Sequence, residues 1–288
     1  MKIGYFKAES TTEYALPTSL FLLLPTLVLY TIFFIYPLAR LFWISFFQPE
    51  FTFGNYISFF EKSFCVVILL KTIRVSLIVA LVCLIIGYPV AYAIAHAKGR
   101  RLAIYLACII LPFWTSILVR NYAWTILLQR KGIINTLLGW IGFIHEPLSL
   151  LYNERAVMIG MIHFLIPFMI LAIYSVLRRI DQNLVQAAYN LGANPVQAFL
   201  LVVFPLSLPG VGAGFSIVFI IGLGFFITPA LLGGTRDLMI STLIETQVSL
   251  NNWPFASAIA IILLLVTLIL ILILNKMLGL DKVYRHEV

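Results

Sequence analysis

Side chains that could catalyse a reaction or bind a metal ion are few and scattered in this sequence. The candidates by residue type are four histidines and three cysteines: His96, His145, His163, His286, Cys65, Cys83 and Cys108. The histidines stand at no ligand spacing with cysteine, aspartate or glutamate, and the cysteines form no CxxC pair. No catalytic triad and no paired carboxylates are visible either. We therefore expect no catalytic residue and no metal site in this chain.

A phosphate-binding loop is also missing from the sequence. No GxxxxGK[ST] motif occurs, so the chain has no P-loop for ATP. The stretch GVGAG at 210–214 lacks the last glycine of GxGxxG and follows no predicted strand. Gly210 and Gly214 instead have the GxxxG spacing, which lets two helices pack closely in lipid. We expect packing or a hinge here rather than a bound nucleotide.

Four basic side chains in or near apolar segments require an explanation: Arg40, Lys71, Arg74 and Arg120. A charge in the hydrocarbon costs at least ~2.5 kcal/mol. Arg40 and Lys71 could reach the membrane surface by snorkelling. Arg74 and Arg120 lie deeper, so each either pairs inside the helix bundle or lines a wet cavity.

Five residues are candidates to line a path for a solute: Trp114, Arg120, Tyr122, Glu245 and Trp253. Their aromatic members also suit the belt that membrane proteins place at the lipid–water interface. Alternatively, the aromatic rings could bind an amine by cation–π contact. Glu245 could attract a cation at the outer mouth, whereas Asp237 beside Arg236 could be a surface pair of little consequence.

The composition predicts the elements that must position these residues. The chain has 288 residues, of which 62% are hydrophobic and only 10% charged, and its mean hydropathy is +1.06. A soluble domain carries about a quarter charged residues. Lipid offers no partner for backbone groups and the alternating pattern of barrel strands is absent, so an all-α polytopic membrane protein is expected. The net charge of +8 is then explained by basic residues at the cytoplasmic ends of the spans, and it does not indicate a nucleic-acid partner.

We predict a single transmembrane domain over residues 1–288 with six spanning helices, the first of them an uncleaved segment. The predicted spans cover residues 17–46, 66–96, 102–128, 156–177, 205–232 and 254–274. A short helix is expected at the outer surface within KGIINTLLGWIGF. With both termini in the cytoplasm, the inner segments hold twice as many lysines and arginines as the outer loops, which favours that orientation.

Residues 181–204 predict a helix–turn–helix between the fourth and fifth spans. Asp181 can cap the first helix, Gly192 can end it, and Asn194 followed by Pro195 can start the second. The polar face of the first helix carries no lysine or arginine, unlike most helices that lie on a membrane surface. From the residues alone, this segment could either dock to a protein or lie on the membrane.

The stretch QAAYNLGANPVQAFLLVVFPLSLPG resembles the EAA…G signature of permease subunits of ABC importers. The matching positions are Ala187, Ala188, Gly192, Ala193, Phe199, Pro205, Pro209 and Gly210. Gln186 replaces the glutamate, which keeps the length of the side chain but removes its charge. FTFGNY, LPFWTSILVRNYAW, FFITPALLGG and NWPFASAIA are similar to segments of the spermidine/putrescine-type branch, in the same order.

This resemblance implies a MetI-like permease in the bacterial inner membrane, surrounded by lipid, with no cofactor of its own. The implied partners are a cytoplasmic ATPase dimer that binds ATP and Mg²⁺, a second permease (related or identical) and a periplasmic binding protein. The residues implied to contact the ATPase are Asp181, Gln186, Ala187, Ala188, Gly192, Ala193, Asn194 and Pro195. A polyamine is the implied solute, with opines, phosphonates and other zwitterionic or anionic solutes as alternatives. An ion-coupled secondary carrier is the alternative from another class, although no acidic residue is expected at mid-membrane.

Overall fold

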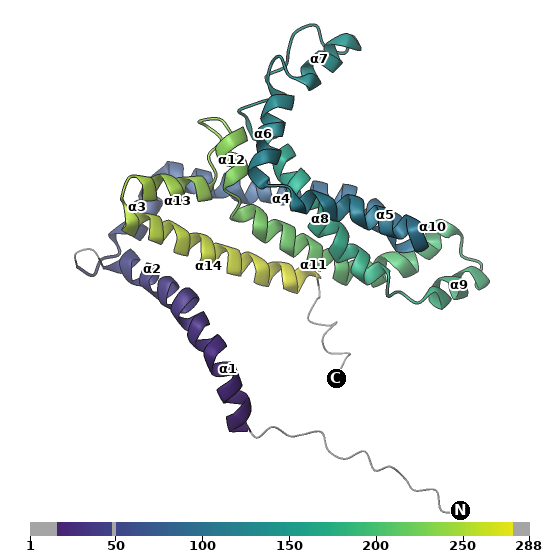
Figure 1. Ribbon diagram of the computed structural model, residues 1–288, viewed down its shortest axis with the longest axis horizontal. Helices are drawn as coiled ribbons and strands as arrows, with labels where there is room; N and C mark the ends of the chain where they lie inside the picture. Colours follow the sequence, from purple (N-terminus) through teal and green to yellow (C-terminus); the bar gives the residue numbers. More distant parts are fainter. Residues whose placement is uncertain (1–15, 48–49, 279–288) are drawn as a thin grey trace, which may run out of the picture.

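The computed structural model describes residues 16–47 and 50–278, and these residues form helices joined by turns (Figure 1). Within these ranges there is no strand, only an isolated bridge between Phe47 and Phe51. The predicted all-α class is therefore confirmed. The prediction that both termini are cytoplasmic concerns residues 1–15 and 279–288, which lie outside the described residues.

The centre of the molecule is a bundle of three long apolar helices: α4 (Ser63–His96), α8 (Glu154–Leu177) and α11 (Phe204–Leu223). Two glycines of α11 allow its backbone to approach α8. A Cβ added to Gly210 would lie 2.9 Å from the Val176 side chain, and one added to Gly214 would lie 2.9 Å from the sulfur of Met169. The GxxxG spacing therefore serves helix packing, as predicted.

A second, smaller core lies at the end of the molecule where α4 begins. There α14 (Trp253–Leu278) packs against α3 (Gly54–Glu61), α13 (Ile240–Ser249) and α2 (Tyr36–Phe46). Its fully buried side chains include Phe59, Cys65, Ile240 and Ile259. Figure 1 shows α3 and α13 together at this end, opposite the end that carries α9.

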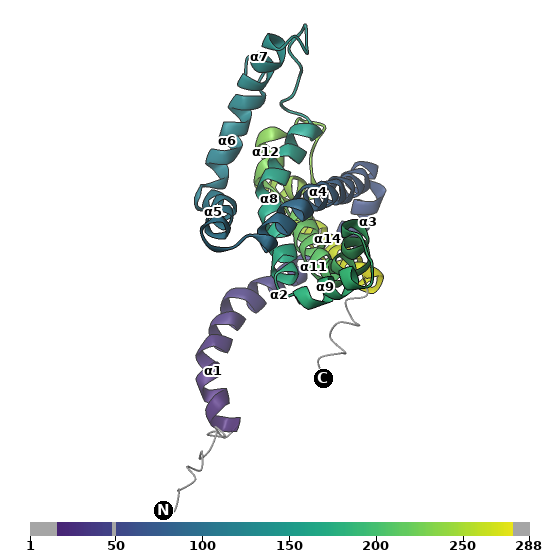
Figure 2. The same ribbon diagram turned by 90° about the vertical axis from the view of Figure 1, so that its right-hand side faces the viewer.

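The first apolar segment packs on α14 through its last helix, whereas its N-terminal part projects away from the bundle (Figures 1 and 2). It consists of α1 (Leu16–Tyr30), a π-helical turn (Thr31–Ile35) and α2. Pro37 accounts for the turn, because proline has no N–H to donate to the carbonyl four residues earlier. Just before it, the Tyr36 N–H bonds to the carbonyl of Thr31, five residues back, which is the spacing of a π-helix. The described side chains from Leu23 to Pro37 are exposed, as expected for a helix that contacts lipid or another subunit.

Five helices in the described part of the chain are long and apolar enough to cross a membrane, or six if one bent pair is counted as a span. The bent pair occupies the predicted span 102–128. It contains α5 (Gly99–Ile110), a 3₁₀ turn (Leu111–Trp114) and α6 (Ile117–Leu128), followed by α7 (Ile133–Trp140). The segments Gly99–Trp114 and Ile117–Trp140 meet at 95°. The predicted span is therefore bent, because Pro112 cannot continue the hydrogen-bond ladder and the Ser116 side chain starts a new helix by accepting from the Leu118 N–H.

The predicted span 205–232 also differs from the structure. The helix begins earlier, with α10 (Pro195–Ala198), passes through a π-helical turn (Phe199–Val203) into α11, and ends at Leu223. Pro205 lacks the N–H that a regular turn needs here, which accounts for the π-helical step. A separate short helix, α12 (Ile227–Leu232), follows Gly224.

Candidate functional site

The helix–turn–helix predicted at 181–204 forms an elbow at one end of the bundle, made of α9 (Gln182–Asn190), a turn and α10 (Figure 1). Asp181 caps α9, because its side chain accepts a hydrogen bond from the Asn183 N–H at 2.9 Å. Arg178 fastens the base of the elbow to the end of α4, since its Nη1 donates to the Ala95 carbonyl at 3.0 Å. The elbow is thus tied to the helix bundle on the side of α4.

The turn of the elbow has the geometry of a Schellman motif. Gly192 has φ +88°, in the left-handed region that glycine adopts without strain. Its N–H donates to the Tyr189 carbonyl at 2.9 Å, and the Ala193 N–H donates to the Ala188 carbonyl at 3.0 Å. These bonds satisfy the last carbonyls of α9 and fix the direction in which the chain leaves it.

The second helix of the elbow starts with a complete capping box. The Gln197 N–H donates to the Asn194 side-chain oxygen at 2.8 Å, and the Asn194 N–H donates to the Gln197 side-chain oxygen at 2.9 Å. Pro195 occupies the first turn, where its missing N–H costs nothing. Gln197 was missed at the sequence level, although the pattern Asn-x-x-Gln carried the signal.

The tip of the elbow is uncharged and carries several exposed apolar side chains. Leu191 is 89% exposed, and Leu184, Tyr189 and Val196 are exposed beside it, whereas Ala198 is buried. Gln186 and Ala187, two residues of the predicted coupling set, are also exposed. No charged residue occurs between Gln182 and Phe204. This surface can bury itself against another apolar surface without separating a charge from water.

A polar cluster lies between α6, α8 and α12, near the bend that follows α5. Trp124 Nε1 donates to His163 Nδ1 at 3.0 Å, and the Arg120 guanidinium carbon lies 4.8 Å from the centre of the Phe164 ring. Arg120 Nη2 donates to the Thr115 carbonyl at 3.3 Å. Its Nε is buried without a hydrogen-bond partner among the described residues, as is the hydroxyl of Thr228. Arg120 is therefore held by an aromatic face and a carbonyl, not by an acidic side chain.

The structure does not bring the five predicted pathway residues to one place. Trp114, which is 86% exposed, and Tyr122 lie on the surface near the polar cluster, to which only Arg120 belongs. Trp253 lines a groove between α2 and α14. Glu245 lies on α13, where its carboxylate accepts a hydrogen bond from the Ser249 hydroxyl at 2.9 Å. A path that uses all five side chains is not formed within this chain.

Two basic residues of α4 form ion pairs that join three separate segments. Lys71 Nζ lies 2.6 Å from Asp237 Oδ1 and 3.5 Å from Glu154 Oε2, and it also donates to the Arg236 carbonyl at 2.9 Å. Arg74 Nη2 lies 2.5 Å from Glu154 Oε2. Asp237 therefore pairs with Lys71 and not with Arg236 as expected, and whether Lys71 also reaches the membrane surface stays a prediction. Arg74 is paired with Glu154, but its side chain is 59% exposed, so the pair lies at the surface and not inside the bundle.

Comparison with known families assigns most of the chain. Residues 83–278 match the family described as "Binding-protein-dependent transport system inner membrane component". This region includes the elbow and the polar cluster, together with α14.

Known relatives and solved structures agree with that match. The "Spermidine/putrescine transport system permease protein PotB" of Escherichia coli (strain K12) is 36% identical over 220 residues, 76% of this chain and 80% of the relative. The protein of the same name from Haemophilus influenzae is 38% identical and aligns with 75% of this chain and 76% of its own length. The fold resembles a "bacterial ABC transporter involved in the import of the acidic polysaccharide alginate", with a TM-score of 0.73, 21% identity and coverage of 91% and 94% of the two chains.

Proposed function

We propose that the solute of this chain is a polyamine such as spermidine or putrescine. The chain belongs to the family of inner membrane components of binding-protein-dependent transport systems, and it is a permease subunit of an ABC importer. The observation that supports this solute is the similarity to relatives that are named as spermidine/putrescine permeases. The match covers three quarters of the chain, and therefore reaches well beyond the elbow.

The elbow is proposed to dock into a cytoplasmic ATPase dimer, which would bind ATP and Mg²⁺. Its turn is fixed by two backbone bonds at Tyr189 and Ala188 and by the capping box at Asn194. α10 continues without interruption into α11, a helix of the central bundle. A displacement of the elbow would therefore move α11 directly, and its uncharged tip fits a cleft by shape.

The proposed assembly follows from this placement. The elbow and both termini lie in the cytoplasm, and a second permease, either related or identical, completes the path. A periplasmic binding protein delivers the solute at the opposite end, where α3 and α13 lie (Figure 1). The five candidate pathway residues would then act together with residues of the second permease.

One observation favours a different solute class. Arg120 lies in the polar cluster with a buried Nε, and no acidic residue lines the small cavity beside it. A guanidinium repels a polycation and binds carboxylates and phosphonates well. An opine, a phosphonate or another zwitterionic or anionic solute is therefore the second candidate.

ATP hydrolysis by the whole complex tests both candidates. The permeases, the ATPases and the binding protein are reconstituted in lipid, and the hydrolysis rate is measured with spermidine, putrescine, an opine and a phosphonate. We expect stimulation by the polyamines and not by the other two. Stimulation by the opine or the phosphonate alone would replace the polyamine with the second candidate. Uptake that survives ATP depletion and stops with an uncoupler would instead indicate an ion-coupled secondary carrier.

A further inference from the structure

The link between the elbow and α11 is continuous, but its backbone hydrogen bonds are irregular. It passes through the π-helical turn at Phe199–Val203, where the Phe204 N–H bonds to the carbonyl five residues back. Pro205 and Pro209 follow, and each lacks the N–H that would bond four residues back. π-helical turns and prolines are typical places for a helix to bend. By itself, this link would bend when the elbow is displaced and would pass on only part of the motion.

A chain of hydroxyl groups ties this link to α4. The Ser207 hydroxyl donates to the Phe204 carbonyl at 2.8 Å, and its oxygen lies 2.8 Å from the hydroxyl oxygen of Tyr88. A serine hydroxyl has a single hydrogen, so Tyr88 is the donor in the bond between α4 and α11. Ser207 is fully buried and stands between the two prolines. The bond therefore holds α4 to the part of the link that the prolines weaken.

Aromatic side chains pack the π-helical turn against the same face of α4. The Phe199 ring meets the rings of Tyr88 and Tyr92 edge to face, with centroids 5.9 and 5.5 Å apart. The Tyr88 ring also lies near that of Phe204, with centroids 5.9 Å apart. Aromatic pairs at these distances attract each other. α4 thus contacts the link at Phe199, at Phe204 and at Ser207.

We infer that Tyr88 is a positioning residue for coupling: it braces the link, so that a displacement of the elbow moves α4 and α11 together. This role rests on the proposed docking of the elbow to an ATPase. Without the brace, the link bends when the elbow moves, and α4 and α11 lag behind. ATP is then hydrolysed without a matching movement of the solute.

A purely structural role for Tyr88 leads to a different result. Loss of a stabilising contact lowers the melting temperature, and uptake and ATP hydrolysis then fall together with the amount of intact complex. Loss of the brace instead lowers the number of solute molecules taken up for each ATP hydrolysed. This coupling ratio therefore distinguishes a positioning residue from one that only stabilises the fold.

Three variants of the whole complex test the brace: Tyr88→Phe, Ser207→Ala and the two combined. Uptake of radiolabelled spermidine and release of phosphate are measured in the same liposomes. For all three we expect a coupling ratio about fivefold lower, which corresponds to the ~1 kcal/mol of one hydrogen bond. The melting temperature should fall most for Ser207→Ala, which leaves the Tyr88 hydroxyl without this partner, and recover in the double variant, which removes both hydroxyl groups. A coupling ratio that never falls, or that recovers together with the melting temperature, would overturn the inference.

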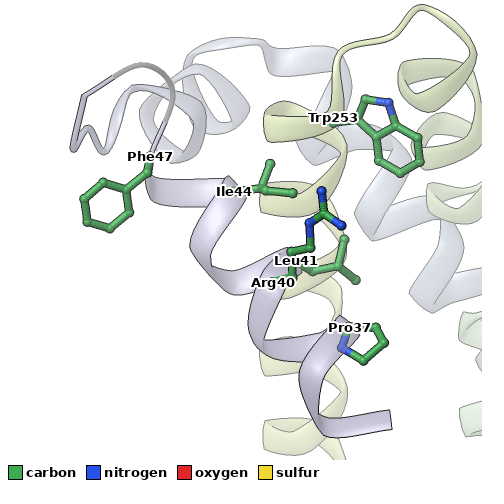
Figure 3. Close-up of a pocket in the computed structure, with 6 residues that line it drawn as sticks. All are labelled: Pro37, Arg40, Leu41, Ile44, Phe47 and Trp253. Atoms are coloured by element: carbon green, nitrogen blue, oxygen red, sulfur yellow. The ribbon is translucent and has the colours of Figure 1, made fainter. Parts of the chain in front are cut away.

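A second hydroxyl chain of the same form provides a matched control. The Tyr56 hydroxyl oxygen lies 2.8 Å from that of Ser45, and Ser45 donates to the Phe42 carbonyl at 2.7 Å. This chain joins α3 to α2, next to Ile44 of the groove in Figure 3, at the end of the molecule opposite the elbow (Figure 1). Tyr56→Phe and Ser45→Ala should lower the melting temperature and leave the coupling ratio unchanged. An equal fall of the ratio in these variants would count against a specific role of Tyr88.

A distance measurement tests the brace without solute or ATP. In a background without the three native cysteines, spin labels are attached to Leu81→Cys on α4 and Val196→Cys on α10, both exposed positions. Electron spin resonance of the whole complex gives the distribution of distances between the two labels. We expect a narrow distribution with the brace intact, a broader one for Tyr88→Phe, and no change for Tyr56→Phe. Equal widths for Tyr88→Phe and the unaltered complex would overturn the inference, whichever solute is carried.

Gly192→Val separates a failure of the brace from a failure of the proposed function. This change acts on the turn of the elbow, not on the contacts with α4. If Gly192→Val lowers the coupling ratio and Tyr88→Phe does not, only the brace is wrong. If neither variant lowers it, coupling through the elbow is wrong, and the role of Tyr88 is rejected with it.

Discussion

Gly192 is the residue on whose backbone conformation the elbow depends most directly. Its φ of +88° is unfavourable for any residue with a Cβ, and most of all for a β-branched one. We predict that Gly192→Val strains the turn by about 1–2 kcal/mol. A shift of about 1.4 kcal/mol changes an equilibrium tenfold. Since the turn sets the direction of α10 and hence of α11, we expect ATP-driven uptake to fall by about that factor while the amount of protein in the membrane stays normal.

Gly142 provides a matched control for this variant. It also has a positive φ, +76°, with open space around it, but it lies after α7 and outside the elbow. Gly142→Val introduces the same kind of backbone strain at a site without a proposed role in coupling. Uptake and immunoblots of isolated membranes are measured for both variants. Normal uptake by Gly192→Val at normal protein level would contradict the role assigned to the turn.

Gly160 is a second position where a single atom matters. A Cβ there would lie 2.6 Å from the Thr228 side chain and 2.8 Å from that of Leu232, so these side chains of α12 would have to shift. We predict that Gly160→Ala costs about 1–3 kcal/mol, as overpacking does in other cores. The melting temperature of the detergent-solubilised complex should fall. The control is Gly139→Ala in α7, where no atom lies within 4 Å of the added carbon, and it should leave the melting temperature unchanged or raise it. An equal fall in melting temperature for Gly139→Ala would show that the effect of Gly160→Ala does not come from packing.

Between elements, the Lys71–Asp237 pair is the contact that fastens the segment between α12 and α13 to α4. Both side chains are less than one-fifth exposed. Removing one partner leaves a charge that is only partly solvated, which costs about 1–3 kcal/mol. We predict that Lys71→Met and Asp237→Asn each lower the melting temperature of the complex, and that the double variant loses less than the sum of the two. Arg236→Gln, which removes a side chain without an ion pair among the described residues, should combine additively with Lys71→Met.

Which contacts could be predicted from the sequence depends on how far apart the two residues lie along the chain. The caps at Asp181, Asn194 and Gly192 were predictable, because each capping bond joins residues a few positions apart. The Trp124–His163 bond spans 39 positions and the Lys71–Asp237 pair spans 166, so packing alone decides them. Helix ends followed hydropathy where the composition changed sharply, as at α4 and α14. They did not where apolar residues continue across a break, as between α5 and α6, because a proline in such a stretch either kinks a helix or ends it.

At the scale of the whole molecule, the length of α8 predicts which segments lie on opposite sides of the membrane. Its 24 residues, Glu154–Leu177, extend about 36 Å, which exceeds the ~30 Å of the hydrocarbon core. The helix separates the segment that carries α7 from the elbow that carries α9. If α8 crosses the membrane, those two segments lie on opposite sides, and the excess of basic residues places the elbow inside.

Single cysteines at these two places make that orientation measurable. In a background from which Cys65, Cys83 and Cys108 have been removed, Trp140→Cys on α7 and Leu191→Cys at the elbow tip replace side chains that are 87% and 89% exposed. Similar exposure means that any difference in labelling reports sidedness. We predict that a membrane-impermeant thiol reagent, given access to the periplasm of intact cells, labels Trp140→Cys and reaches Leu191→Cys only after lysis. Bound ATPase should then protect Leu191→Cys in lysed membranes, because the proposed docking covers it. Labelling of Leu191→Cys in intact cells would place the elbow on the side where no ATP-hydrolysing partner can reach it, and coupling through the elbow would have to be abandoned.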